Sequence, residues 1–242
     1  KVFSVCGTKW MWLISDDDIL VENSIEIVNE NIHQNISTSY LKFSIEGIGE
    51  SGLEDNISVS SLEDLLDYSY SKRPLHRGNF VFVSNGVFNL EILDKYLGRA
   101  FQYSYTYIGY LIPVLFSLQD KNNVTFSNEV IIKYNNPGLD FWSFEKVGLG
   151  LSTISHIKFD INKFYHKRLL NFLMAVPYKL LYTYLLKEEN FYYRNSFRLI
   201  YNSIYKYYLN YVQRLFCLFL IQSFNFPKTS RLLLRKFKEL KR

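Results

Sequence analysis

The sequence predicts an α/β fold: a mixed sheet with flanking helices, followed by a mainly helical C-terminal region. Up to about residue 150, stretches with strand composition alternate with helical segments, which is the pattern of an α/β domain. From about residue 140 helix-compatible residues dominate. We therefore expect two parts, residues 1–150 and residues 151–242.

Four stretches have strand composition because they are rich in β-branched or aromatic residues. The first, at residues 10–14, reads as a short buried strand. The others are "YLKFSI" (40–45), the alternating "NFVFVS" (79–84) and "NVTFSNEVIIKYN" (123–135).

Helices are expected between these strands. Asn23 is placed to cap the first of them, and Ser60 with Glu63 has the spacing of a capping box for the second. Residues 85–98 read as a turn followed by a helix that ends at Gly98, and residues 103–118 as a further apolar helix.

Charge is divided unevenly along the chain, whose formal net charge is +5. Residues 179–242 hold 13 Lys and Arg against 3 Glu, so the rest of the chain is acidic. Cys6 and Cys217 lie far apart and match no metal-ligand spacing, which favours two reduced thiols in a cytoplasmic protein. The split predicts an acidic body and a basic tail with separate roles.

Three adjacent carboxylates, Asp16, Asp17 and Asp18, directly follow the first predicted strand. Taken alone, such a cluster also suits a solvated loop or a helix N-terminus. However, open α/β sheets bind ligands at the carboxyl ends of their strands. Adjacent carboxylates there repel one another unless a cation relieves them, and their oxygens suit Mg²⁺ or Mn²⁺.

The stretch "KWMWLISDDDIL" (9–20) resembles the metal-binding motif of family 2 glycosyltransferases with the GT-A fold. It is most similar to the bacterial branch that builds O-antigen and capsular polysaccharides. "NFVFVSNGVFNLEIL" (79–93) resembles the acceptor-side segment of these enzymes, and "KYNNPGLDFWSF" (133–144) the segment after the last core strand. The resemblance covers about residues 1–150 and implies a partial GT-A-like domain.

The resemblance implies transfer of a sugar from a nucleotide-sugar donor to a lipid-linked or oligosaccharide acceptor, with Mn²⁺ or Mg²⁺ as cofactor. Asp18 matches the expected metal ligand. Asp16 and Asp17 are implied as contacts of the donor or of metal-bound water, and Asp16 also as a metal ligand. Which of the three aspartates binds the metal directly stays open, because the motif can be registered one residue either way. Ser84, Asn85 and Gly86 would face the acceptor, or form a structural turn that needs glycine.

The sequence departs from the family pattern in two respects. The N-terminal half with its "P-x-Y-N" strand is absent, and roughly 80 to 100 further residues would be needed to supply it. Where the family usually carries an acidic base, this chain has "AFQYSYTYIGYLIPVL" (100–115), so we assign no catalytic base.

The basic C-terminal region contains an apolar helical stripe at three- and four-residue spacing, which includes Tyr211, Leu215 and Phe219. Aromatic-rich helices that end in "RLLLRKFKELKR" (231–242) suit adsorption to an anionic membrane surface, at the inner face of the plasma membrane. A helical subdomain that packs on the body is equally compatible. We expect no nucleic-acid partner, because the basic residues fan around the helix.

Two functional hypotheses therefore stand. The first is a metal-dependent glycosyltransferase in bacterial surface polysaccharide biosynthesis. The alternative is a non-catalytic membrane-associated interaction module, or an inactive remnant of a transferase.

Overall fold

The computed structural model describes residues 6–47, 56–70, 77–104, 108–135, 153–173, 198, 202 and 211–223. The chain divides into two compact units. The first comprises residues 1–141 with 157–173, and the second residues 142–156 with 174–242. The sequence-based boundary at residue 150 falls within the first segment of the second unit, and the candidate site lies in the first unit.

The first unit is built on a mixed sheet, as the α/β prediction requires. Its path runs β1-β5-β3-β6-β2, and β4 also pairs with β6. Among the described strands, the β3–β6 pairing is parallel and the other pairings are antiparallel. The strands are β1 (Trp10–Trp12), β2 (Ile19–Leu20), β3 (Tyr40–Glu46), β4 (Ile57–Val59), β5 (Gly86–Asn89) and β6 (Val124–Lys133).

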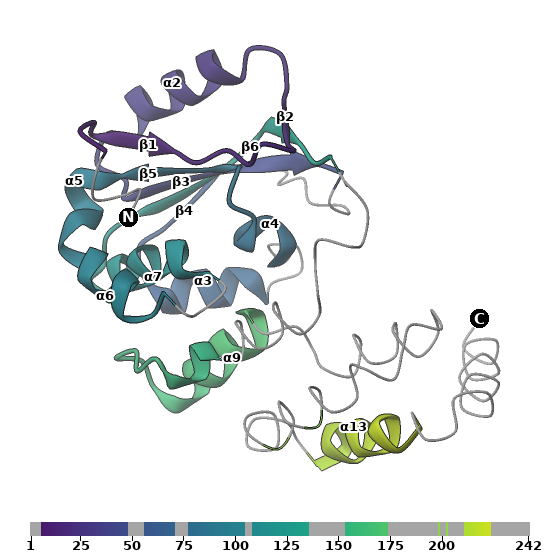
Figure 1. Ribbon diagram of the computed structural model, residues 1–242. Coiled ribbons are helices and arrows are strands. Elements are labelled where there is room, and N and C mark those ends of the chain that lie inside the picture. The colour runs from purple at the N-terminus through teal and green to yellow at the C-terminus, as the bar shows by residue number, and fades with distance from the viewer. Residues whose placement is uncertain are drawn as a thin grey trace. The chain divides into compact units, whose positions relative to one another are not determined.

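Helices cover both faces of this sheet (Figure 1). On one face lies α2 (Ser24–Gln34), whose Val28 joins a buried cluster with Leu41 and Phe43 of β3. The opposite face carries α3 (Leu62–Ser69) and α7 (Ile112–Gln119). The central strand β3 is therefore buried on both faces up to Ile45, and even its polar residues Lys42 and Ser44 lie out of water.

Short elements complete the first unit around β5. They are α4 (Arg77–Val81) before it and α5 (Leu90–Leu93), η1 (Asp94–Tyr96) and α6 (Leu97–Gln102) after it, with η2 (Gly109–Leu111) leading into α7. The consequence is that β5 begins directly after a turn at residues 82–85, which we call the Ser84 turn.

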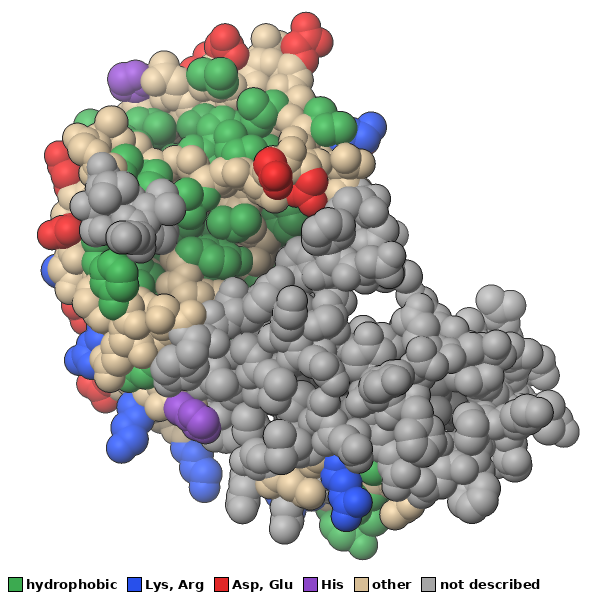
Figure 2. Space-filling model, viewed as in Figure 1, with side chains coloured by type: hydrophobic (Ala, Val, Ile, Leu, Met, Phe, Trp, Pro, Cys, Tyr) green, Lys and Arg blue, Asp and Glu red, His purple; other side chains and the backbone are tan. Residues whose placement is uncertain are grey.

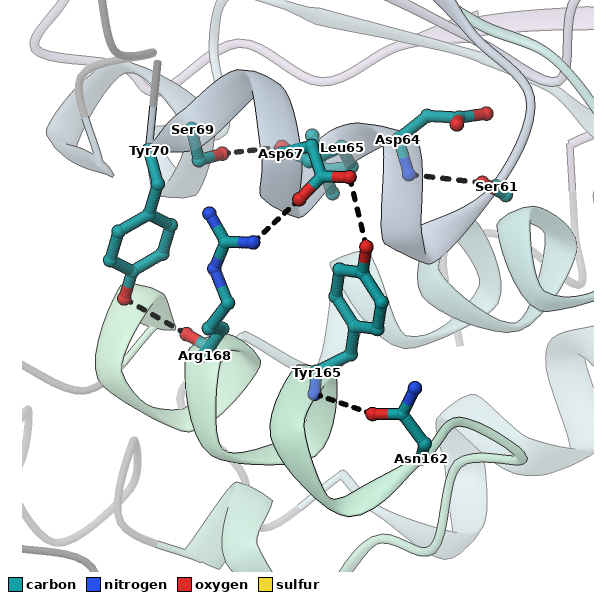
Figure 3. Close-up of polar contacts among 9 residues, drawn as sticks. All are labelled: Ser61, Asp64, Leu65, Asp67, Ser69, Tyr70, Asn162, Tyr165 and Arg168. Atoms are coloured by element: carbon teal, nitrogen blue, oxygen red, sulfur yellow. Dashed lines mark hydrogen bonds and ion pairs between the residues drawn. The ribbon is translucent and has the colours of Figure 1, made fainter.

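The helix α9 (Lys163–Leu173) is anchored to α3 by a polar and aromatic cluster (Figure 3). Arg168 forms an ion pair with Asp67 at 2.5 Å, and the hydroxyl of Tyr165 donates to the same carboxylate at 2.9 Å. The guanidinium of Arg168 also lies 4.5 Å from the ring centre of Tyr70. These contacts hold α9 against α3 within the first unit.

Several predicted elements are confirmed. A strand precedes the three aspartates, "YLKFSI" forms β3, and "NVTFSNEVIIKYN" contains β6. Asn23 is the N-cap residue of α2, but its side chain makes no capping hydrogen bond, and its backbone is left-handed with φ 60°.

The strand predicted at residues 79–84 is wrong. This stretch contains the end of α4 and most of the Ser84 turn, and the strand comes afterwards as β5. Phe80 lies in α4, fully buried, with its ring 5.4 Å from Phe172 and 6.2 Å from Phe126. Tertiary packing of this aromatic side chain overrides the strand propensity of its neighbours.

Two boundary predictions are also wrong. The cap of α3 is Ser61 rather than Ser60, because the Ser61 hydroxyl accepts the backbone N–H of Asp64 at 3.0 Å. Gly98 lies inside α6 and does not end the predicted helix, which is divided between β5 and three short helices.

The described part of the second unit holds η3 (Thr153–His156) and α13 (Tyr211–Ser223). The helix predicted around the apolar stripe is therefore found at residues 211–223. Residues 136–152 and the basic tail from residue 224 lie outside the described residues. Within the described segments, no helix has the length and apolar character needed to cross a membrane.

Candidate functional site

The acidic loop, which we define as residues 13–18 between β1 and β2, meets the Ser84 turn because β1 and β5 are antiparallel. The register pairs Trp10 with Asn89 and Trp12 with Val87. Continued for three residues, the same register places Ser15 opposite Ser84. The backbone N–H of Ser15 does donate to the Ser84 hydroxyl oxygen, at 2.9 Å.

Ser84 is the centre of a hydrogen-bonded group that holds the acidic loop. Its hydroxyl donates to Oδ2 of Asp18 at 2.6 Å, while its carbonyl accepts the indole N–H of Trp12 at 2.6 Å. Together with the bond from Ser15, these contacts connect the Ser84 turn to both ends of the segment 12–18. The structure therefore brings one predicted acceptor residue, Ser84, directly onto a predicted metal ligand, Asp18.

Asp18 keeps one carboxylate oxygen uncommitted. Its Oδ1 is buried and has no hydrogen-bond partner among the described residues. Burial raises the pKa of the Asp18 carboxyl, and the charge of Asp17 raises it further; the bonds from Ser84 and from the Asn135 backbone oppose this rise. A carboxylate held under these conditions is stabilised by a cation.

The other two aspartates are placed differently. The Asp17 carboxylate accepts a hydrogen bond from the Ser15 hydroxyl. Asp16 is exposed. Among the described residues, no group of three His, Cys, Asp or Glu side chains is arranged to hold a metal ion. The loop thus offers Asp18, with at most one neighbouring carboxylate, to a cation.

The end of β6 also reaches the acidic loop, a contact that sequence analysis missed. The charges of Asp17 and Asp18 contribute to raising the pKa of Tyr134, after burial, and the backbone N–H of Asn135 stabilises the Asp18 carboxylate. The ring of Tyr134 packs edge-on against Phe82, at 5.6 Å between ring centres. The sequence feature that could have indicated this contact is the position of Tyr134, at the end of the predicted strand that contains β6.

Asn85 is fully buried behind the Ser84 turn. Its amide donates to the Phe43 carbonyl and to the side chain of Asn79, and its side-chain oxygen accepts from Lys42. In this arrangement Asn85 stabilises the turn from the core side. Its contact with an acceptor stays a prediction.

Gly86 is required by close packing rather than by an unusual backbone angle. A Cβ at this position would overlap with the hydroxyl of Tyr40 on β3, which is fully buried. The Tyr40 hydroxyl has no hydrogen-bond partner among the described residues, and burial raises its pKa well above the ordinary value. Glycine therefore lets β5 lie against Tyr40 at the point where the Ser84 turn ends.

The carboxylate oxygens of this loop fit a small divalent cation that takes most of its ligands from water and substrate. Mg²⁺ commonly binds through one or two carboxylates and completes its shell with water and substrate phosphates. Asp18 supplies the free oxygen, and Asp16 or Asp17 is near enough in sequence to add a second.

In comparisons with known proteins, no family model and no curated protein matches the chain. The fold and the geometry of the acidic loop therefore carry the functional argument.

We expect Asp18→Asn to raise the melting temperature at pH 7 without divalent cations, because asparagine removes a partly buried charge. The folded pKa of Asp18 is raised, so this group favours the folded state below its unfolded pKa of about 3.9 and loses that contribution as the pH rises through the folded pKa. At pH 7 the wild type carries the partly buried charge of Asp18, whereas asparagine is neutral. Thermal unfolding of both proteins measures the difference.

The difference in melting temperature between Asp18→Asn and the wild type should disappear near pH 3, where the wild-type carboxyl is protonated. Asp16→Asn is the matched control because Asp16 is exposed, and it should leave the melting temperature nearly unchanged. An Asp18→Asn protein less stable than the wild type at pH 7 would contradict this assignment of the buried charge.

Proposed function

We propose that this chain carries the metal-binding part of a glycosyltransferase that moves a sugar from a nucleotide-sugar donor to a glycan or lipid-linked acceptor in bacterial surface polysaccharide assembly. The observation that carries the proposal is the Asp18 carboxylate, held through Oδ2 by Ser84 with Oδ1 buried and unpartnered among the described residues. It lies in the loop that follows β1, a strand at the edge of the sheet.

The described architecture is compatible with a GT-A-like domain. The strand β1 leads into the three aspartates, α2 follows them, and the sheet is mixed with helices on both faces. The resemblance of residues 9–20 to the family 2 motif supports the same assignment.

Each residue of the loop has a distinct role in this proposal. Asp18 offers its free oxygen to Mn²⁺ or Mg²⁺, and Asp16 is the second candidate ligand. Asp17, fixed by Ser15, lies beside Asp18 to contact the donor or cation-bound water. When bound, the cation neutralises the charge that develops on the leaving nucleotide diphosphate.

The Ser84 turn forms the other side of the proposed site. Its contribution is orientation, since the Ser84 hydroxyl holds one Asp18 oxygen and leaves the other free. The ring of Tyr134 is partly buried, and the charges of Asp17 and Asp18 contribute to raising the pKa of its hydroxyl. In this proposal the ring contacts the donor's sugar or base. No residue is proposed as the catalytic base.

Calorimetric titration with Mn²⁺ and a panel of nucleotide-sugars tests the proposal on the product of the complete gene. We expect at least one nucleotide-sugar to bind only when Mn²⁺ is present. Asp18→Ala should weaken this binding at least about tenfold, because it removes the free carboxylate oxygen.

Asp94→Ala is the matched control, since Asp94 is an exposed acidic residue of the same unit that lies in η1. It should bind as the wild type does. A folded wild-type protein that binds no nucleotide-sugar with either metal would refute the transferase assignment.

A second function, a membrane-associated module, is favoured by α13. Six large hydrophobic side chains of this helix are exposed, between 39% and 73%: Tyr211, Val212, Leu215, Phe216, Leu218 and Phe219. At about 100° per residue they share one broad face, whereas Cys217 and Ile221 are buried on the other. Hydrophobic and basic side chains are visible at the surface where α13 lies (Figure 2). With the excess of basic residues in 179–242, such a face suits an anionic bilayer.

Vesicle sedimentation tests this second function. The wild type should sediment with phosphatidylglycerol vesicles but not with phosphatidylcholine vesicles, and high salt should weaken binding. A Leu215→Gln, Phe219→Gln double variant should lose most of the binding. The same substitutions at Ile25 and Ile36, which are exposed in the first unit, serve as the control and should bind normally.

Equal sedimentation of the Leu215, Phe219 double variant and the wild type would exclude α13 as the membrane-binding face.

A further inference from the structure

Lys42 is a fully buried lysine in the centre of the sheet. It belongs to β3, and its ammonium makes no ion pair with any residue that the structure describes. Its Nζ donates hydrogen bonds to the Phe82 carbonyl and to Oδ1 of Asn85. The ring of Tyr40 lies beneath it, 5.8 Å from Nζ to the ring centre.

The two acceptors of Lys42 are the first and last residues of the Ser84 turn. One side chain from the neighbouring strand therefore holds both ends of the turn, with Val83 and Ser84 between them. Asn85 is held further by its bonds to Asn79 and to the Phe43 carbonyl. These contacts fix the core side of the turn, and Ser84 makes its contacts on the other side, with β1 and the acidic loop.

Lysine is an unfavourable residue for this position if stability alone matters. Burial of an ammonium without a carboxylate partner is costly, and burial lowers the pKa of Lys42 well below its ordinary value. Methionine has a similar shape and would fill the space without that cost. Lys133 on β6 shows the ordinary arrangement, exposed and 3.5 Å from Glu46.

We propose that Lys42 is a positioning residue of the acidic site: its two hydrogen bonds fix the Ser84 turn so that the Ser84 hydroxyl meets Oδ2 of Asp18 and leaves Oδ1 free for a cation. The binding of a cation at Asp18 rests on the proposed function. The positioning of Ser84 and Asp18 does not, because it follows from the contacts of Lys42, Phe82 and Asn85 alone.

Hydrogen exchange followed by NMR tests the positioning directly. In Lys42→Met, the backbone N–H of Ser15 and the indole N–H of Trp12 should exchange at least about tenfold faster than in the wild type, because both donate to Ser84. The N–H groups of Leu65 and Tyr70 at the two ends of α3 should keep their rates. A general loss of stability would accelerate all four.

Mn²⁺ affinity, measured by paramagnetic broadening of the Asp18 and Ser15 signals, is the second readout. We expect Lys42→Met to bind Mn²⁺ at least about tenfold more weakly than the wild type. Lys42→Gln, which retains a side-chain donor, should restore part of both the protection and the affinity. Lys133→Met is the matched control and should change neither.

Wild-type exchange rates at Ser15 and Trp12 in a folded Lys42→Met protein would overturn the positioning role. If the wild type binds no Mn²⁺ while the exchange result holds, the proposed function fails and the positioning stands. If Lys42→Met does not fold, the Lys42→Gln rates decide. If neither variant folds, the test is made on the wild-type protein, by measuring through-space NMR contacts of the Lys42 Hε protons. Contacts to the side-chain amide protons of Asn85 support the proposal, and their absence overturns it.

Discussion

The hydrogen bond from Ser84 to Asp18 is the interaction on which the arrangement of the site depends. It joins two segments that are 66 residues apart and that meet only because β1 and β5 are antiparallel neighbours. The acidic loop has one further anchor in the same turn, the bond from the Ser15 N–H. Without the Ser84 turn, the loop would stay attached to the sheet through β2 and β6, but it would lose the bonds that hold Ser15 and Asp18 in place.

The core side of that turn is unusually polar for the centre of a protein. Lys42 of β3, Asn79 of α4 and Asn85 of the turn are all fully buried, and Asn85 is hydrogen-bonded to both of the others. A satisfied polar network in the interior fixes a single geometry, because moving any member leaves a buried group unpaired. The chain therefore accepts a cost in stability to hold Ser84, and through it Asp18, in one place.

Asp18 shows the same compromise on the other side of the turn. An unpartnered, buried carboxylate oxygen beside a second aspartate opposes folding, and a cation would relieve both effects. Groups that weaken folding in this way often gather at functional sites. The two costs, at Lys42 and at Asp18, lie on opposite sides of Ser84.

The sequence was sufficient for the parts of the fold with strong local patterns. The strand before the aspartates, β3 and β6 are rich in apolar, aromatic or β-branched residues, and most of these residues are buried or partly buried in the sheet. The segment at 79–84 has the same composition but is mostly helix and turn, because Phe80 is drawn into contact with Phe126 and Phe172, and these partners are distant in sequence.

The sequence predicted only some of the residues of the candidate site. The three aspartates and the Ser84 turn were marked by motif, although nothing in the sequence showed that Ser84 and Asp18 bond to each other. Lys42 could not be predicted as buried, since a lysine in an alternating strand normally faces water. Its burial follows from the helices that cover both faces of β3.

The most direct test of this account is anomalous diffraction from a crystal of the protein soaked in MnCl₂. We expect a manganese peak about 2.1 Å from Oδ1 of Asp18, with the Ser84 hydroxyl still bonded to Oδ2. A manganese peak elsewhere, or none at Asp18 in a crystal where the loop is open to solvent, would contradict the claim that the Ser84 turn holds Asp18 ready for a cation.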